Sequence, residues 1–315
     1  MFFQNEREEF FSKAVSLLIK WWRVDVLRSR IVNRFLSSLG VALWMTGAMV
    51  SGQINVEREL AESSEQHMRE ELGVNPVTSP SIAGLLQDLE VFRPVPIQLI
   101  QETDHTLSFN NRLQTALHFG SMVADGFMLT IAERPQDVQL IGRELIRQSR
   151  ALGVGGKLTS RSKSLFEFSD KGDWLGMREE LIRTQEDVEL SMMELHDEEM
   201  AHMVSLGGWL RGFQLGACSS VERYTIAKAD ILARISVMDY FLDRLGTLNP
   251  NLKSTEMVAA LIKKITEIRR VIIEAQGATP TPDQVGKMSK LANEAEAIAT
   301  AKVDGDGRFI EKLTP

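Results

Sequence analysis

The chain has 315 residues, of which 43% are hydrophobic and 25% charged, and it contains one cysteine, Cys218. This composition is typical of a globular protein, and a single cysteine excludes both an intramolecular disulfide and a multi-cysteine zinc or iron–sulfur site. The formal net charge of −7 argues against nucleic-acid binding, because a polyanion must be met by an excess of Lys and Arg.

The first informative element is a run of 22 residues without a charge, residues 35–56. Arginines are frequent before it and glutamates follow it, a distribution typical of a segment that inserts into a membrane with its basic flank inside. We therefore expect residues 1–52 to be a leader that contains either a cleaved signal peptide or a retained membrane anchor. Serines and glycines dilute the run, which favours cleavage. The alternative interpretation is a core helix that lacks charge.

A leader of this kind is typical of bacterial export. It predicts a periplasmic or otherwise extracytoplasmic protein, or an inner-membrane protein if the leader is retained. Without the leader, 29 basic and 39 acidic side chains remain, a net charge of −10. An acidic domain is repelled by nucleic acid and by anionic lipid. We expect contact with a membrane only through residues 1–56, if they are not cleaved.

Residues 53–110 are expected to hold N-terminal helices and a proline-containing connector. The predicted helices cover residues 55–72 and 82–92, and Pro94 and Pro96 end the second, because neither can donate a helical hydrogen bond. Residues 111–303 are the predicted core domain, in which apolar residues recur at three- and four-residue spacing. Residues 304–315 are expected to be a flexible tail.

The core is predicted to be all-α, an irregular bundle of antiparallel helix pairs joined by turns. A helix pair of roughly 40 residues recurs, so a short α-solenoid is the alternative. One stretch, residues 157–172, is predicted to be a polar connector without helix. The predicted helices cover residues 111–133, 137–152, 174–195, 197–216, 220–245, 254–276 and 282–303.

Asp125 is the most interesting charged residue of the core, because its sequence neighbours are apolar or small. A buried carboxylate needs a cation or several N–H donors, and Arg211 lies in a similar apolar setting. We expect the two to pair. They form either a structural ion pair or, with Trp209 as a wall, a ligand pocket.

Glu199 and His202 lie three residues apart in a predicted helix, a spacing that lets both side chains bind one metal ion in ferritin-like proteins. Glu102 and His105 repeat the spacing, although outside a predicted helix. The alternative is that the acidic residues before His202 form a capped turn between two helices. We expect no cofactor, with iron or zinc at Glu199 and His202 as the exception.

The sequence contains no coherent catalytic set. The preferred hypothesis is an exported, non-catalytic helical protein that binds or scaffolds a protein or small-molecule partner. The alternatives are a ferritin-like metalloprotein and a membrane-anchored helical protein.

Overall fold

The computed structural model describes residue 86 and residues 88–310, apart from the side chains of residues 156–163. All of them belong to one compact unit, Leu72–Pro315. The predicted leader, the helix at residues 55–72 and the last five residues lie outside the described part. Within that part the elements are helices with no strand among them, so the predicted all-α bundle is confirmed.

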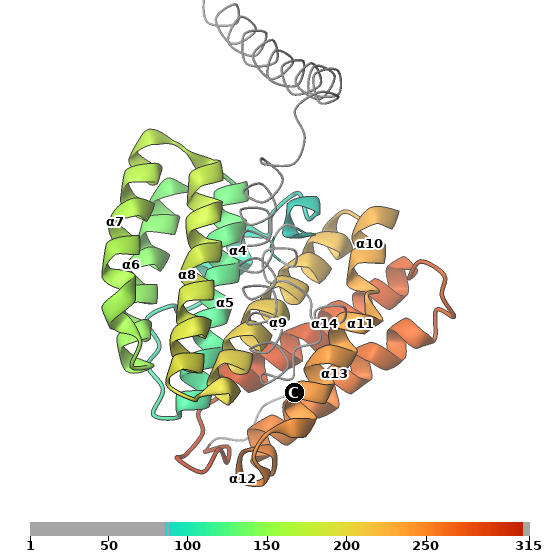
Figure 1. The fold of residues 1–315 in the computed structure, drawn as a ribbon. Helices are drawn as coiled ribbons and strands as arrows, with labels where there is room; N and C mark the ends of the chain where they lie inside the picture. The colour runs from blue at the N-terminus through green and yellow to red at the C-terminus, as the bar shows by residue number, and fades with distance from the viewer. Residues whose placement is uncertain (1–85, 87, 311–315) are drawn as a thin grey trace, which may run out of the picture. The chain divides into compact units, whose positions relative to one another are not determined.

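Four helices form the first half of this unit, and each runs antiparallel to the one before it (Figure 1). The first helix packs against the second and the fourth. The third helix also packs against the second and the fourth, so the four helices form a closed bundle. In chain order they are α5 (Arg112–Ile131), α6 (Pro135–Ala151), α7 (Gly155–Lys171) and α8 (Trp174–Glu194).

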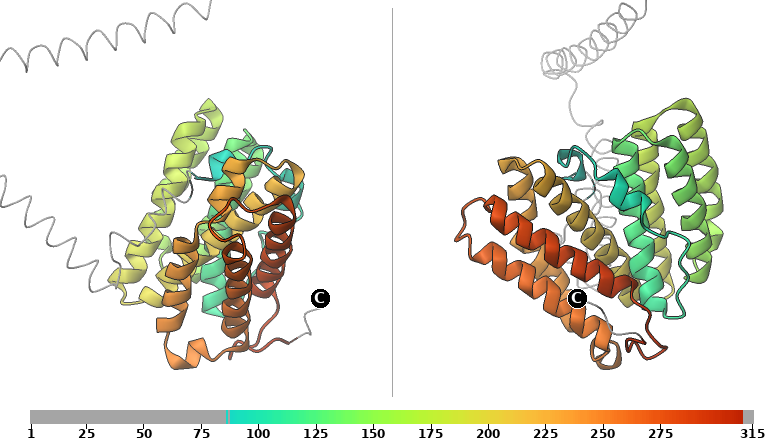
Figure 2. Two further views of the ribbon diagram at one scale, coloured as in Figure 1. Left: turned by 90° about the vertical axis from the view of Figure 1, so that its right-hand side faces the viewer. Right: turned by 180° about the vertical axis from the view of Figure 1, so that it is seen from behind.

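The second half is built on a longer helix that packs against both the first half and the C-terminal helix (Figure 2). The C-terminal helix, α14 (Pro282–Thr300), pairs with α13 (Glu256–Ile273). In turn, α13 contacts α11 (Ile235–Thr247). The elements are α9 (Glu198–Glu222), α10 (Ile226–Leu232), α11 (Ile235–Thr247), α12 (Pro250–Lys253), α13 (Glu256–Ile273) and α14 (Pro282–Thr300).

Glycines allow α5 and α9 to approach each other closely at the centre of the unit. A Cβ atom at Gly120 would lie 1.9 Å from the carbonyl oxygen of Val204, and one at Gly207 would lie 1.9 Å from that of Leu117. Neither position can hold a side chain without separating the two backbones. This crossing joins the two halves of the fold.

Side-chain caps set the starts of several helices. Asn111 accepts hydrogen bonds from the first-turn N–H groups of α5, and Asp173 does the same for α8. Thr281 and Gln284 form a reciprocal capping box at the start of α14. These contacts satisfy N–H groups that have no partner within their own helix.

The prediction of a polar connector at residues 157–172 is wrong, because this stretch forms α7. Its serines and charged residues weaken the apolar pattern, but Leu165 is buried and Phe168 packs against the core. The hydroxyl of Ser169 also accepts a hydrogen bond from Gln139 on α6. Contacts with neighbouring helices outweigh the low helix propensity of the segment.

The prediction of one continuous helix over residues 220–245 is also wrong. The chain becomes extended at Arg223, and Thr225 caps the new helix α10. The buried Lys228 ammonium group donates to the carbonyl oxygens of Ser219 and Arg223, so it supplies hydrogen bonds at the end of α9. The polar contacts at this break replace the helical hydrogen bonds that the apolar periodicity predicts.

The segment before α5 is mostly non-helical. It holds a short 3-10 turn, η2 (Leu89–Val91), where the sequence predicts a helix to residue 92, and a one-turn helix, α4 (Ile97–Gln101).

At the other end, residues 304–310 do not extend freely. Asp304 accepts from the backbone N–H groups of Asp306 and Arg308, and the N–H of Phe309 donates to Glu256 at the start of α13.

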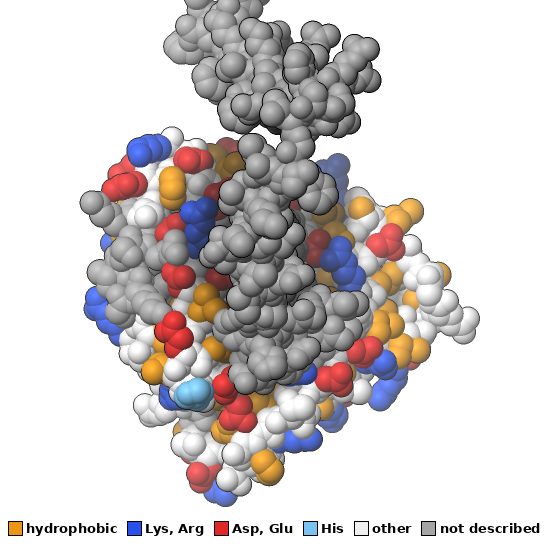
Figure 3. Space-filling view, viewed as in Figure 1, with side chains coloured by type: hydrophobic (Ala, Val, Ile, Leu, Met, Phe, Trp, Pro, Cys, Tyr) orange, Lys and Arg blue, Asp and Glu red, His pale blue; other side chains and the backbone are white. Residues whose placement is uncertain are grey.

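No helix among residues 86 and 88–310 is both long enough and apolar enough to cross a bilayer. Figure 3 shows acidic, basic and apolar side chains interspersed on the described part of one face.

Candidate functional site

A buried ion pair joins α5 and α9 at the centre of the unit. Asp125 and Arg211 are both almost completely buried, and they pair through two hydrogen bonds. The Nε of Arg211 donates to Oδ1 of Asp125 at 2.6 Å, and Nη2 donates to Oδ2 at 3.2 Å. The structure thus brings together the two charged residues whose pairing the sequence suggests.

The remaining polar atoms of this pair also have partners. Arg211 donates through Nη1 to Oε1 of Gln214 at 2.6 Å and through Nη2 to the hydroxyl of Thr103 at 2.8 Å. The Nε2 atom of His105 lies 2.8 Å from Oδ2 of Asp125. Removing one member of a buried pair would leave an uncompensated charge, so this fully partnered arrangement supports a structural role for the pair.

A polar cleft of about 280 Å³ lies beside the ion pair and includes Arg211 in its lining. Glu296 of α14 is half-buried in it and accepts a hydrogen bond from Ser121 at 3.2 Å. Burial raises the pKa of the Glu296 carboxyl group, while the neighbouring Arg211 opposes this shift. Most of the residues that line the cleft are polar or charged, among them Glu102, Asp104 and Glu296.

Trp209 does not reach this cleft, so the structure divides the predicted set of Asp125, Trp209 and Arg211 between two places. Residues two apart on a helix point about 200° away from each other, which follows from 3.6 residues per turn. Trp209 stacks on Phe241, with ring centroids 5.0 Å apart, and lies beside Phe213 at 5.6 Å.

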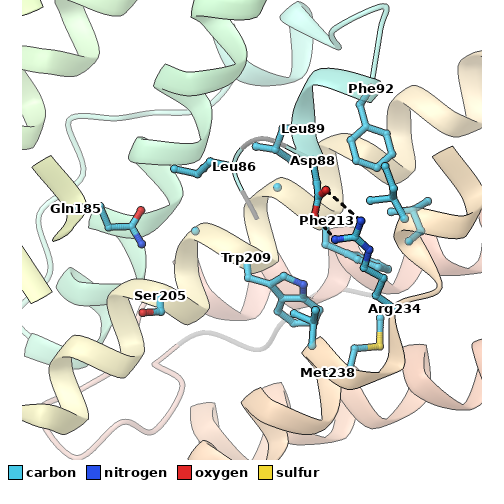
Figure 4. A pocket seen from close by; sticks show the side chains of 15 residues that line it. Leu86, Asp88, Leu89, Phe92, Gln185, Ser205, Trp209, Phe213, Arg234 and Met238 are labelled. Atoms are coloured by element: carbon cyan, nitrogen blue, oxygen red, sulfur yellow. Dashed lines mark hydrogen bonds and ion pairs between the residues drawn. The ribbon is translucent and has the colours of Figure 1, made fainter. Parts of the chain in front are cut away.

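Trp209 instead lines an apolar pocket along α9, which we call the α9 pocket (Figure 4). Its enclosed volume is about 50 Å³, and it opens to solvent. Glycines Gly208 and Gly212 of α9 form part of its lining. The other lining residues are Leu86, Asp88, Leu89, Phe92, Gln185, Ser205, Trp209, Phe213, Ile231, Leu232, Arg234, Val237 and Met238.

One end of the α9 pocket is polar. Gln185 of α8 is 2% exposed, and its Nε2 donates to Oε1 of Glu189 at 3.0 Å. The hydroxyl of Ser205 donates to the same Glu189 oxygen at 2.8 Å. The Oε1 atom of Gln185 is buried and has no hydrogen-bond partner among the described residues. Buried polar atoms in native proteins nearly always have partners, so this atom requires an explanation.

The carboxyl group of Glu189 contacts Gln185 and Ser205 at this polar end. Burial raises the pKa of its carboxyl group to about 7, even though Gln185 and Ser205 both donate to it. The carboxyl group therefore changes its charge near neutral pH.

The opposite end of the α9 pocket carries an ion pair. Arg234, at the start of α11, donates through Nη2 to Oδ1 of Asp88 at 3.1 Å and through Nη1 to Oδ2. In Figure 4 this pair lies across the pocket from Gln185 and Ser205, with Trp209 between the two ends. The pocket thus has an apolar middle, a neutral polar end and a charged rim whose charges cancel.

Of the two predicted metal-binding residues, Glu199 is engaged elsewhere. Oε1 of Glu199 accepts a hydrogen bond from the backbone N–H of Asn249 at 2.5 Å. Burial, and then the nearby Arg244, lower the pKa of His202 to about 4. A cation at Arg244 opposes the binding of a second cation at His202. Among the described residues no group of three or more His, Cys, Asp and Glu is arranged to hold a metal ion.

Gln185 is not among the site residues predicted from the sequence. Its signal is nevertheless present, because Gln185 lies four residues after the buried Leu181 and three before the buried Val188. A polar residue on the apolar face of a helix indicates a buried hydrogen-bonding group. The lining from the segment around Phe92 could not be foreseen, since it depends on how that segment folds over α9.

Comparison with known proteins gives no relative from which a function could be transferred. No protein-family model, curated protein sequence or solved structure is significantly similar to the chain.

Proposed function

We propose that this domain is a non-catalytic binding module and that the α9 pocket receives the apolar part of a small molecule. The observation that carries the proposal is an apolar pocket, walled by Trp209 and Phe213, with one unsatisfied polar atom at its end. Small-molecule sites in proteins typically combine apolar and aromatic walls with a few placed polar groups.

The size of the pocket limits what it can take. An enclosed volume of about 50 Å³ holds only a few non-hydrogen atoms, so the rest of a ligand must lie in the open part of the pocket. Phenol is a suitable probe, because its ring matches the aromatic wall and its hydroxyl group can enter the enclosed end.

Gly208 offers a way to close the pocket without unfolding the protein. A Cβ atom there would lie 3.4 Å from the carbonyl oxygen of Gly120 and 3.6 Å from Oε1 of Gln185, which are ordinary van der Waals distances. The variant Gly208→Ala therefore keeps the fold, and alanine favours a helix by about 1 kcal/mol over glycine. The added methyl group occupies the space in front of Gln185.

The test is a titration of phenol followed by NMR of methyl-labelled methionines, because Met238 lines the pocket. We expect the Met238 signal to shift with saturation in the native protein and to need at least about fivefold more phenol in Gly208→Ala, a loss of roughly 1 kcal/mol. The control Gly286→Ala, where a Cβ meets open space, should bind as the native protein does. No saturable shift of Met238 would refute the proposal.

Export is a separate proposal, and it rests on residues 35–56 and their flanks. It places the binding module outside the cytoplasm.

A further inference from the structure

We propose that the ligand of the α9 pocket carries a neutral hydrogen-bond donor, an O–H or N–H group, that binds Oε1 of Gln185. The inference rests on the proposed function, since it names the chemical class of ligand that the same pocket takes. Three features of the pocket carry it.

The first feature is the fixed orientation of the Gln185 amide. Its Nε2 donates to Oε1 of Glu189, and Ser205 donates to the same oxygen. Turning the amide over would place its carbonyl oxygen against Oε1 of Glu189, the oxygen that accepts from Ser205, and break the hydrogen bond. The amide oxygen is thus held as an acceptor that points away from Glu189.

The second feature is the space in front of that oxygen. Oε1 of Gln185 is buried and has no partner among the described residues, and it lies 3.6 Å from the position that a Cβ atom of Gly208 would occupy. A buried acceptor without a donor is unfavourable, so a group that donates to it gains more here than in water. The pocket therefore selects for a donor at its enclosed end.

The third feature is the charge of the surroundings. Asp88 and Arg234 neutralise each other at the rim, and the rest of the pocket lining is uncharged. An anion would meet the lone pairs of Gln185 with Glu189 close behind. The apolar walls of Trp209 and Phe213 favour an uncharged body, so the ligand class is a small apolar molecule with one donor, such as a phenol or an alcohol.

The decisive comparison uses phenol, toluene and anisole, which differ in the group that reaches Gln185. Toluene replaces the hydroxyl with a methyl group, and anisole keeps the oxygen but has no donor. We expect phenol to bind the native protein about tenfold more tightly than either, as a buried hydrogen bond predicts. Equal affinity for all three would overturn the inference, and a tighter complex with benzylammonium would show that the ligand is a cation.

The variant Gln185→Met tests the acceptor directly, because methionine has a similar length and no acceptor amide. We expect it to lose the preference for phenol and to keep the affinity for toluene within about twofold. A preference that persists in Gln185→Met would refute the role of this atom. If none of the probes binds the native protein, the proposed function fails. If all bind equally, only this inference fails, and the ligand series decides this without any variant.

Discussion

Asp125 and Arg211 are buried, and each is the opposite charge that neutralises the other. The variant Arg211→Met leaves the Asp125 carboxylate buried without its cation, and we expect a loss of about 3–5 kcal/mol in the free energy of unfolding. Urea denaturation measures this loss. The double variant Asp125→Asn with Arg211→Met should lose less than the sum of the two single variants, because neither charge is then left alone.

The matched control for this prediction is an exposed ion pair. Arg308 lies 3.6 Å from Asp306, and both side chains are largely exposed, so Arg308→Met should change the free energy of unfolding by less than about 1 kcal/mol. If Arg211→Met is no more harmful than Arg308→Met, the central pair does not stabilise the fold.

Glu189 predicts a pH dependence of stability with a definite sign. Burial raises the pKa of its carboxyl group from 4.5 to about 7, so the folded state keeps a proton that the unfolded state releases. The free energy of unfolding therefore falls as the pH rises from 4.5 to 7. In Glu189→Gln this side chain stays neutral, so the variant should gain stability relative to the native protein across that range.

The quantity to follow is the difference in the free energy of unfolding between Glu189→Gln and the native protein at each pH. Burial lowers the pKa values of His118 and His202 to about 4, and these shifts make the native fold more stable as the pH rises. Both histidines are present in native protein and variant, so their effect cancels in the difference. A difference that stays constant from pH 4.5 to 7 would contradict the raised pKa.

At the scale of the helix, the α5–α9 crossing depends on two glycines. Alanine at Gly120 or at Gly207 would place a methyl group on a backbone oxygen of the other helix, and we expect each to lose about 3 kcal/mol or more. Gly286 is the control, since it lies inside α14 with open space around it and Gly286→Ala should gain up to about 1 kcal/mol. Thermal or urea unfolding separates the two cases, and a harmless Gly120→Ala would contradict the close crossing.

The helices of the core could be predicted wherever apolar spacing and caps agree. α8 and α14 begin at the predicted residues, because Asp173 and Thr281 both cap and are followed by regular apolar positions. α7 could not be predicted, since its own sequence is polar and neighbouring helices supply the contacts. The break before α10 depends on Lys228, whose ammonium group reaches back to α9 only in the folded chain.

The candidate site could likewise be predicted only in part, because some of its features depend on tertiary contacts. The pairing of Asp125 with Arg211 could be foreseen from two charged residues in apolar surroundings. Trp209 could have been separated from Arg211 on helical geometry alone, because the two point to different faces. The α9 pocket as a whole is a tertiary feature, since its walls come from segments as distant in the chain as Phe92 and Met238.

For the whole molecule, the proposed leader at residues 1–52 predicts where the chain is found when it is expressed in a bacterial cell. We expect the protein recovered from the soluble exported fraction to begin near Met49 or Gln53, where small residues precede a cleavage point. Mass spectrometry with N-terminal sequencing gives the answer. An intact chain in the membrane fraction would favour the anchor, and an intact chain in the cytosol would contradict export.

We propose that the α9 pocket, rather than the polar cleft beside Arg211, holds the ligand. Intermolecular NOEs between bound phenol and the protein test it most directly, because methyl groups line both places. If phenol binds in the α9 pocket, we expect NOEs from phenol to Met238 and to the indole of Trp209. NOEs to Leu99 and Ala297 in the polar cleft, with none to Met238, would contradict it.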